Sequence, residues 1–145
     1  MIKIEYPPFL PKNEIREGKE YIFDEVRKLW VILTPEEWVR QNFLQYLIQV
    51  KQYPAMLIAV EKEIYQVDIK KRVDIVVYDR NTKPWMIIEC KEMKVVLNNT
   101  VFDQALRYNI NLQAAYVVIT NGTYCFAFSK NAGQFVALTT LPEYE

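Results

Sequence analysis

The sequence contains no histidine among its 145 residues. This absence excludes hydrolases in which a histidine activates a serine or cysteine nucleophile, and it excludes most zinc enzymes. Any catalysis must therefore depend on carboxylates, lysine, tyrosine, or a metal ion held by oxygen ligands.

Cysteine and glycine are scarce as well. The two cysteines, Cys90 and Cys125, are too few for a disulfide framework and lack the spacing of a zinc site. We expect both to be reduced thiols in the core of a cytoplasmic protein. Three glycines are too few for a collagen-like chain or a flexible linker.

Long apolar runs and net charge are missing too. No stretch approaches the roughly twenty apolar residues of a membrane span, and the start, MIKIEYPPFL, lacks the apolar region of a secretory signal. We therefore expect no membrane partner. Eighteen basic and eighteen acidic residues cancel, which weakens the case for a nucleic-acid-binding protein. A nuclease stays possible, because it combines acidic residues in its site with basic residues around it.

What is present suits one globular domain. The chain is 51% hydrophobic and 25% charged, a balance typical of folded rather than disordered proteins. Residues 1–20 are rich in proline and charge, and we expect them to form an irregular N-terminal arm. Residues 21–145 would then form a single domain, beginning with a strand or hairpin over 21–33 at the edge of its sheet.

The remaining elements follow from periodicity and turn chemistry. Thr34-Pro35-Glu36-Glu37 has the composition of a helix start, and apolar residues at helical spacing predict a helix over 35–50. A second helix is predicted from a capping box at Thr100 and Asp103 to about Leu112. Strands are predicted over 55–66, 72–79, 84–91, 114–120 and 123–129, and near 134–138. This order predicts an α/β fold with a central mixed sheet flanked by helices.

Charged residues lie at the ends of two of these apolar strands. The turn-rich link over 79–83 joins them as an antiparallel pair, and counting outward from its centre places Asp74 opposite Glu89. Side chains alternate along a strand, so Glu89 and Lys91 share one face while Cys90 occupies the other.

This set of charges is suited to metal-assisted phosphodiester hydrolysis. The carboxylates of Asp74 and Glu89 can bind Mg²⁺ or Mn²⁺, and Lys91 can orient a water or stabilise developing charge. The alternative is a solvated cross-strand ion pair, worth about 1 kcal/mol or less.

The same stretch resembles the PD-(D/E)xK nuclease signature, with Asp74 as its aspartate and Glu89-Cys90-Lys91 as its E-x-K. Val73 replaces the proline of that signature. Gln104 and Tyr108 resemble the Q-x-x-x-Y motif of RecB-like nucleases. The segments TPEEWVRQNFLQYLI, KRVDIVVYD, MIIECK, FDQALRYN and VITNG are similar to the N-terminal nuclease domain of type I restriction enzyme R subunits. They occur in family order over roughly residues 20 to 129.

The resemblance implies a restriction-endonuclease-like fold, Mg²⁺ as the ion with Mn²⁺ able to substitute, and DNA as the substrate. It implies that Asp74 and Glu89 ligate the metal and that Lys91 is the catalytic lysine. Gln104 and Tyr108 would support the site or contact DNA. They are i and i+4 on one helical face, beside Arg107, and a plain polar helix surface is the alternative.

The family often adds an acid from the first helix. Glu37 or Glu36 can fill this role, and we favour Glu37 because Gln41, Leu44 and Ile48 continue its face toward the sheet. The alternative for both acids is complementation of the helix dipole.

Several basic and aromatic residues are candidates for nucleic-acid contacts. Lys71, Arg72 and Arg107, with Arg40 nearby in the predicted site, can contact phosphates. The alternative for each is a solubilising surface charge. We expect the large aromatic residues to pack in the core or at edges rather than to stack on bases; these are Tyr6, Tyr21, Trp30, Trp38 and Trp85.

The leading hypothesis is a metal-dependent, endonuclease-like deoxyribonuclease from a restriction or DNA-processing system. The motor domains of an R subunit do not follow in these residues, so we expect a stand-alone nuclease, one piece of an assembly, or a nuclease fold used for binding. The expected partners are DNA and other subunits of such a system, with a homodimer as a further option. The alternative function is a non-catalytic module that binds DNA or protein.

Overall fold

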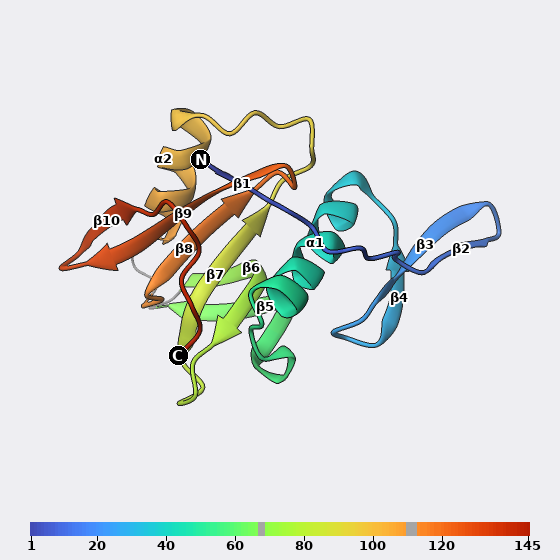
Figure 1. Ribbon diagram of the computed structural model, residues 1–145, viewed down its shortest axis with the longest axis horizontal. Coiled ribbons are helices and arrows are strands. Elements are labelled where there is room, and N and C mark those ends of the chain that lie inside the picture. Colours follow the sequence, from blue (N-terminus) through green and yellow to red (C-terminus); the bar gives the residue numbers. More distant parts are fainter. Residues whose placement is uncertain (67–68, 110–112) are drawn as a thin grey trace.

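A seven-stranded mixed sheet forms the centre of the molecule (Figure 1). The computed structural model describes residues 1–66, 69–109 and 113–145, without the side chains of 64–66, 69–71, 108 and 109. The strand order is β1–β9–β8–β7–β6–β5, and β10 also pairs with β9. β7 and β8 are parallel, whereas the other described pairs are antiparallel. The strands are β1 (Ile2–Lys3), β5 (Ile58–Gln66), β6 (Ile69–Tyr78), β7 (Pro84–Cys90), β8 (Tyr116–Thr120), β9 (Tyr124–Asn131) and β10 (Gln134–Ala137).

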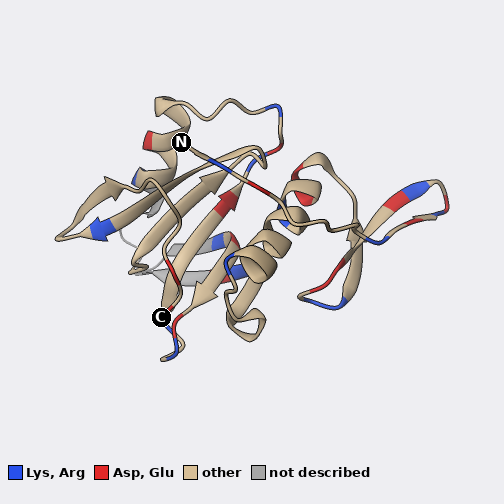
Figure 2. Cartoon of the chain, in the orientation of Figure 1, with Lys and Arg blue, Asp and Glu red and all other residues tan. Residues whose placement is uncertain are grey.

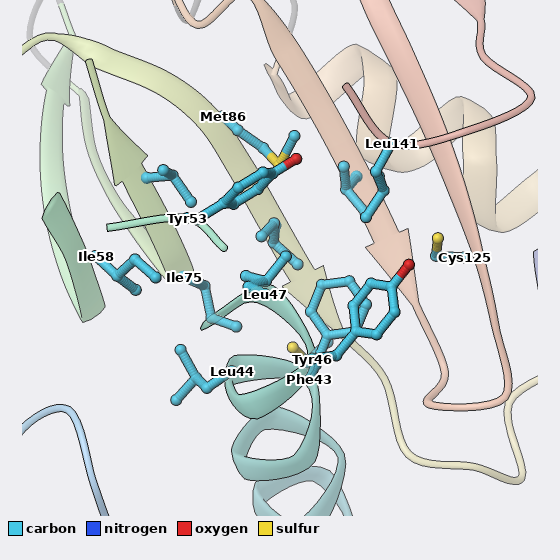
Figure 3. Close-up of a cluster of buried hydrophobic side chains, with 14 of the residues drawn as sticks. Phe43, Leu44, Tyr46, Leu47, Tyr53, Ile58, Ile75, Met86, Cys125 and Leu141 are labelled. Carbon is cyan, nitrogen blue, oxygen red and sulfur yellow. The ribbon is translucent and has the colours of Figure 1, made fainter. Parts of the chain in front are cut away.

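Two helices cover opposite faces of this sheet. On one face, Phe43 and Leu47 of the first helical segment lie in a core with Ile75, Met86 and Ile88 (Figure 3). On the other face, Leu106 of the second helix packs against Val76, Ile87 and Val117. The two helices are α1 (Pro35–Gln45), which continues as a π-helical segment over Tyr46–Val50, and α2 (Asn99–Asn109). The predicted α/β fold and the helix over 35–50 are confirmed, and no helix in the described ranges is long and apolar enough to cross a bilayer.

The helix caps agree with the sequence at α1 and differ at α2. Thr34 Oγ1 accepts the backbone N–H of Glu37 at 3.0 Å, as its position before a proline predicts. At α2 the cap is Asn98, whose Oδ1 accepts the N–H of Val101 at 3.0 Å. The predicted capping box at Thr100 is therefore wrong, because α2 begins one residue earlier and Thr100 lies inside it. The predicted end near Leu112 lies outside the described residues.

A separate three-stranded antiparallel sheet precedes α1 and lies to the right of it in Figure 1. It consists of β2 (Asn13–Arg16), β3 (Lys19–Asp24) and β4 (Leu29–Ile32). The expectation of an irregular arm over residues 1–20 is wrong here, because β1 joins the main sheet and β2 pairs with β3. Glu17 and Gly18, with φ of 50° and 75°, form the two-residue turn that hairpins prefer. Residues 21–33 do form two strands, but in this second sheet and not at the edge of the main one.

The predicted turn at Asn121-Gly122 joins β8 to β9, which pair antiparallel. Gly122 has a φ of 91°, and a Cβ there would lie 3.1 Å from the Val39 side chain. Glycine therefore allows both the turn and the close approach of α1. Cys90 and Cys125 are buried free thiols, and burial raises the pKa of Cys125 to about 12. Their predicted position in the core is confirmed.

Candidate active site

Asp74 lies where the pairing of β6 and β7 ends. The two strands pair through Ile75 and Ile88, so the next position along each strand places Asp74 level with Glu89. Asp74 Oδ2 accepts the backbone N–H of Cys90 at 2.8 Å, which takes the place of a further bond between the strands. The Asp74 carboxyl also interacts electrostatically with Glu89 and Lys91. The predicted antiparallel pairing is confirmed, and it makes Asp74 level with Glu89 at the end of β7.

Glu89 and Lys91 face α2. They line a depression of about 420 Å³ together with Gln104 of that helix. Cys90, between them, is buried in the core on the α1 side, so the predicted alternation along this strand is confirmed. The crossover from β7 through α2 to the parallel strand β8 therefore carries Gln104 back to the charged end of β7.

Asp74 lines a second depression, of about 590 Å³, on the α1 side. Its other charged lining residues are Glu36, Glu37, Arg40, Glu61, Arg72 and Glu92. Figure 2 shows acidic segments both at the start of α1 and near the end of β7. Acids from α1, β5 and β6 thus surround one hollow, although they are far apart in the sequence.

Arg40 is the centre of an ion-pair network in this hollow. Its Nε donates to Glu37 Oε2 at 2.8 Å, and its Nη2 donates to the other oxygen of Glu37 and to Glu61 Oε1 at 3.0 Å. Its Nη1 lies 3.4 Å from Asp74 Oδ1. Burial opposes the charge, but the bonds and charges of Glu37 and Glu61 outweigh it and hold the Arg40 pKa above its usual value. The Arg40 guanidinium is thus already paired with carboxylates, which argues against the phosphate contact considered for it.

Glu61 is a site residue that the sequence analysis missed. It lies in β5 between Val60 and Lys62, which pair with Ile75 and Val73, so Glu61 is level with Asp74. Its φ of 53° is left-handed, which is unusual for a residue within a strand. Strained non-glycine residues of this kind concentrate at functional sites. The only sequence signal for Glu61 is an acidic residue within a predicted strand. That signal does not distinguish a functional site from a solvent-exposed strand edge.

A comparison with protein families shows which family the chain belongs to. A model of the family described as type I restriction enzyme R protein N terminus (HSDR_N) matches residues 35–142. The chain belongs to this family. The match confirms the resemblance and includes α1, α2 and all strands from β5 to β10. A search of curated proteins finds no match.

In this HSDR_N domain the two acids at the start of α1 have different surroundings. The Glu37 side chain is 8% exposed and accepts bonds from Arg40 and Gln41. Glu36 is exposed on the rim, where partial desolvation of its carboxyl and the charge of Asp74 raise its pKa while Lys91 lowers it. Gln41 does continue the face of Glu37 inward, as expected, but the outcome is an ion-pair network. It is Glu36 that interacts with Asp74 and Lys91.

The described carboxylates of the HSDR_N site are not arranged as a cage for a divalent ion. Across the described parts of the chain, no three histidine, cysteine, aspartate or glutamate side chains converge on one ion-sized position. Burial raises the pKa of Asp74, and together with the smaller repulsion from Glu89 it outweighs the lowering by the Cys90 N–H, Arg40 and Lys91. Mg²⁺ needs only one or two protein carboxylates, because water and substrate phosphates complete its shell. Asp74 and Glu89 are thus carboxylates of the type and number that Mg²⁺ uses, whereas the described residues form no cage of three or more protein ligands.

Of the predicted DNA-contacting residues of the HSDR_N domain, Arg72 lines the hollow that contains Asp74. The Arg72 side chain is 67% exposed and lies 2.5 Å from Glu61, and Arg107 is exposed on α2. The side chains of Lys71 and Tyr108 lie outside the described residues, so both assignments stay predictions.

Proposed function

We propose that this domain hydrolyses DNA phosphodiester bonds in the presence of Mg²⁺, with Mn²⁺ able to substitute. The observation that carries the proposal is that Asp74 lies level with Glu89 where the pairing of β6 and β7 ends and interacts electrostatically with both Glu89 and Lys91. The family description, the N terminus of a restriction enzyme R protein, supports DNA as the substrate and other restriction subunits as partners. The family match gives no support to a homodimer.

We assign the metal to the carboxylates of Asp74 and Glu89, with Glu36 as the acid supplied by α1. Glu36 replaces our earlier preference for Glu37, because Glu37 is already neutralised by Arg40. A bound Mg²⁺ polarises the phosphodiester and lowers the pKa of a water. Burial is the main cause of the raised pKa of both Asp74 and Glu36, and repulsion between neighbouring carboxylates adds to it.

Lys91 is the proposed catalytic lysine. Its ammonium interacts with the carboxyls of Asp74 and Glu36, so it can orient a water or stabilise the charge that develops on the phosphate. Gln104, in the same hollow as Lys91, supports the site or contacts DNA, as does Tyr108. We assign phosphate contacts to Arg72, which lines the hollow that contains Asp74, and to Arg107 and Lys71.

The test is cleavage of plasmid and linear DNA by the purified chain with Mg²⁺, with Mn²⁺, and with chelator. Lys91→Ala should abolish cleavage, whereas Lys83→Ala, an exposed lysine in the β6–β7 turn, should cleave as the wild type does. Equal cleavage by Lys91→Ala and the wild type contradicts the assignment.

The two acids of α1 can be separated by the same assay. Glu36→Gln should lower cleavage and raise the Mg²⁺ concentration that half-saturates it. Glu37→Gln should instead lower the free energy of unfolding, because it strips Arg40 of its bidentate partner. The reverse pattern restores Glu37 as the helix acid.

A second candidate function is DNA or protein binding without cleavage. The observation that favours it is the contact of Arg40 with Asp74 Oδ1 at 3.4 Å, since a resident cation competes with a metal for that oxygen. Stable DNA binding with no cleavage under Mg²⁺ or Mn²⁺ identifies this function.

A further inference from the structure

One face of the small β2–β3–β4 sheet carries aromatic rings and basic side chains together. The register pairs Glu14 with Tyr21, Arg16 with Lys19, Phe23 with Trp30 and Tyr21 with Ile32. Paired residues share a face of a sheet. We call this surface the aromatic–basic face, and its residues are Lys12, Glu14, Arg16, Lys19, Tyr21, Phe23, Trp30 and Ile32.

The cations of this face lie over its rings. The Arg16 guanidinium carbon is 5.2 Å from the centre of the Trp30 ring and 5.7 Å from that of Tyr21. Lys12 Nζ is 5.4 Å from the centre of the Phe23 ring. The Phe23 and Trp30 rings contact each other edge to face, with centres 5.2 Å apart. The rings and cations thus form one stacked layer.

The opposite face of the sheet explains why these rings are not in the core. Ile22 and Asp24 are fully buried there, and Asp24 Oδ2 accepts bonds from Gln41 of α1 at 3.0 Å and from Arg27 at 2.7 Å. That face fixes the sheet to α1. Tyr21 and Trp30 stay half-buried, so of the two expected positions, core or edge, they occupy an edge.

Two observations identify the occupant of this face. First, it carries three cations and one acid, Glu14, which already pairs with Arg16 at 2.9 Å, so an anionic ligand with flat rings complements it. Second, the face leads to the proposed active site, because Ile32 on it also lines the hollow that contains Asp74 and Glu36. The face lies in residues 12–32, outside the segment that matches the family.

We propose that the aromatic–basic face binds single-stranded DNA and leads it to the hollow at Asp74. Unpaired bases stack on the Trp30 and Tyr21 rings and on the Arg16 guanidinium, while phosphates contact Lys12 and Lys19. A duplex keeps its base faces stacked internally and cannot use the rings in this way. The inference deepens the proposed function by naming its substrate class, although binding by this face requires no cleavage.

The test measures fluorescence anisotropy of a labelled oligothymidine of about 12 nucleotides, within the usual site size, at low salt with chelator. The single strand should bind at least tenfold more tightly than a duplex of the same length and should quench tryptophan fluorescence. Trp30→Ala and Arg16→Gln should each weaken it roughly tenfold, the scale of losing one stacking partner. Lys28→Gln, an exposed cation beside the same sheet, and Tyr124→Ala, an exposed aromatic on β9, are matched controls that should bind as the wild type does.

The outcomes separate this inference from the nuclease proposal. Arg16 is exposed, so Arg16→Gln keeps the fold and tests the aromatic–basic face. Circular dichroism shows whether Trp30→Ala disturbs the small sheet, and Arg16→Gln tests the face even if it does. Single-strand binding by a chain that does not cleave supports the face and contradicts only catalysis. Equal affinity for strand and duplex, or unchanged binding by Arg16→Gln, overturns the inference. So does a concentration-dependent dimer that Trp30→Ala abolishes, because the face is then an interface between copies.

Discussion

Replacing Arg40 with methionine tests the ion-pair network that holds α1 against the main sheet. Arg40 and Glu37 are each 8% exposed and joined by two bonds. Methionine keeps most of the apolar stem, so the variant removes mainly the guanidinium. It leaves a buried carboxylate at Glu37 without its cation.

The magnitude follows from the partners that remain. Removing one member of a buried ion pair costs about 3–5 kcal/mol. Glu37 keeps a bond from Gln41 Nε2 at 3.0 Å and lies 4.0 Å from Arg27, so the lower end applies. Glu61 is 31% exposed and keeps Arg72, which adds at most about 1 kcal/mol. We expect a loss of about 3 kcal/mol, or a melting temperature lower by roughly 6–12 °C for a domain of this size.

Urea denaturation of a double-mutant cycle measures this loss. Glu37→Gln removes the carboxylate charge that Arg40→Met leaves without its cation. The double variant should therefore lose less stability than the sum of the losses of the two single variants. The expected coupling free energy is about 2 kcal/mol, within the range for contacting residues. A loss below about 1 kcal/mol for Arg40→Met, or a coupling near zero, refutes the argument that this pair is buried and mutually dependent.

Three further predictions concern stability. Burial raises the pKa of Asp24, but bonds from Arg27 and Gln41 outweigh it and the net pKa is lowered, so its stabilisation is complete above the unfolded pKa of about 3.9. Asp24→Asn should therefore be less stable than wild type at pH 7, with the difference shrinking below about pH 4 in urea titrations. The Asp74 pKa is raised, so the stability that the protonated carboxyl contributes is lost as pH rises through the folded pKa. The Asp74→Asn side chain cannot ionise, so the free energy of unfolding of this variant should fall less than that of the wild type as pH rises above about 4. Gly122→Ala should lower stability by more than about 1 kcal/mol, because of its φ of 91° and the nearby Val39; Gly18→Ala, also at positive φ but in open space, separates the two causes.

Much of the fold and part of the site follow from local sequence. The turn over 79–83 and the apolar runs beside it determine the β6–β7 pairing, and this pairing brings Asp74 level with Glu89. The period of two along β7 separates Glu89 and Lys91 from Cys90. These are properties of neighbouring residues, so spacing alone predicts them.

The tertiary structure alone decided which acid of α1 is neutralised and which faces the site. Helical periodicity directed Glu37 inward correctly, but it could not show that Arg40 and Gln41 donate to Glu37 there, or that Glu61 shares Arg40 with it. It likewise could not show that Tyr21 and Trp30 lie on an open face, because burial of Ile22 and Asp24 against α1 selects the other side of that sheet. Both outcomes depend on contacts between distant segments, and spacing within one segment carries no information about its partner.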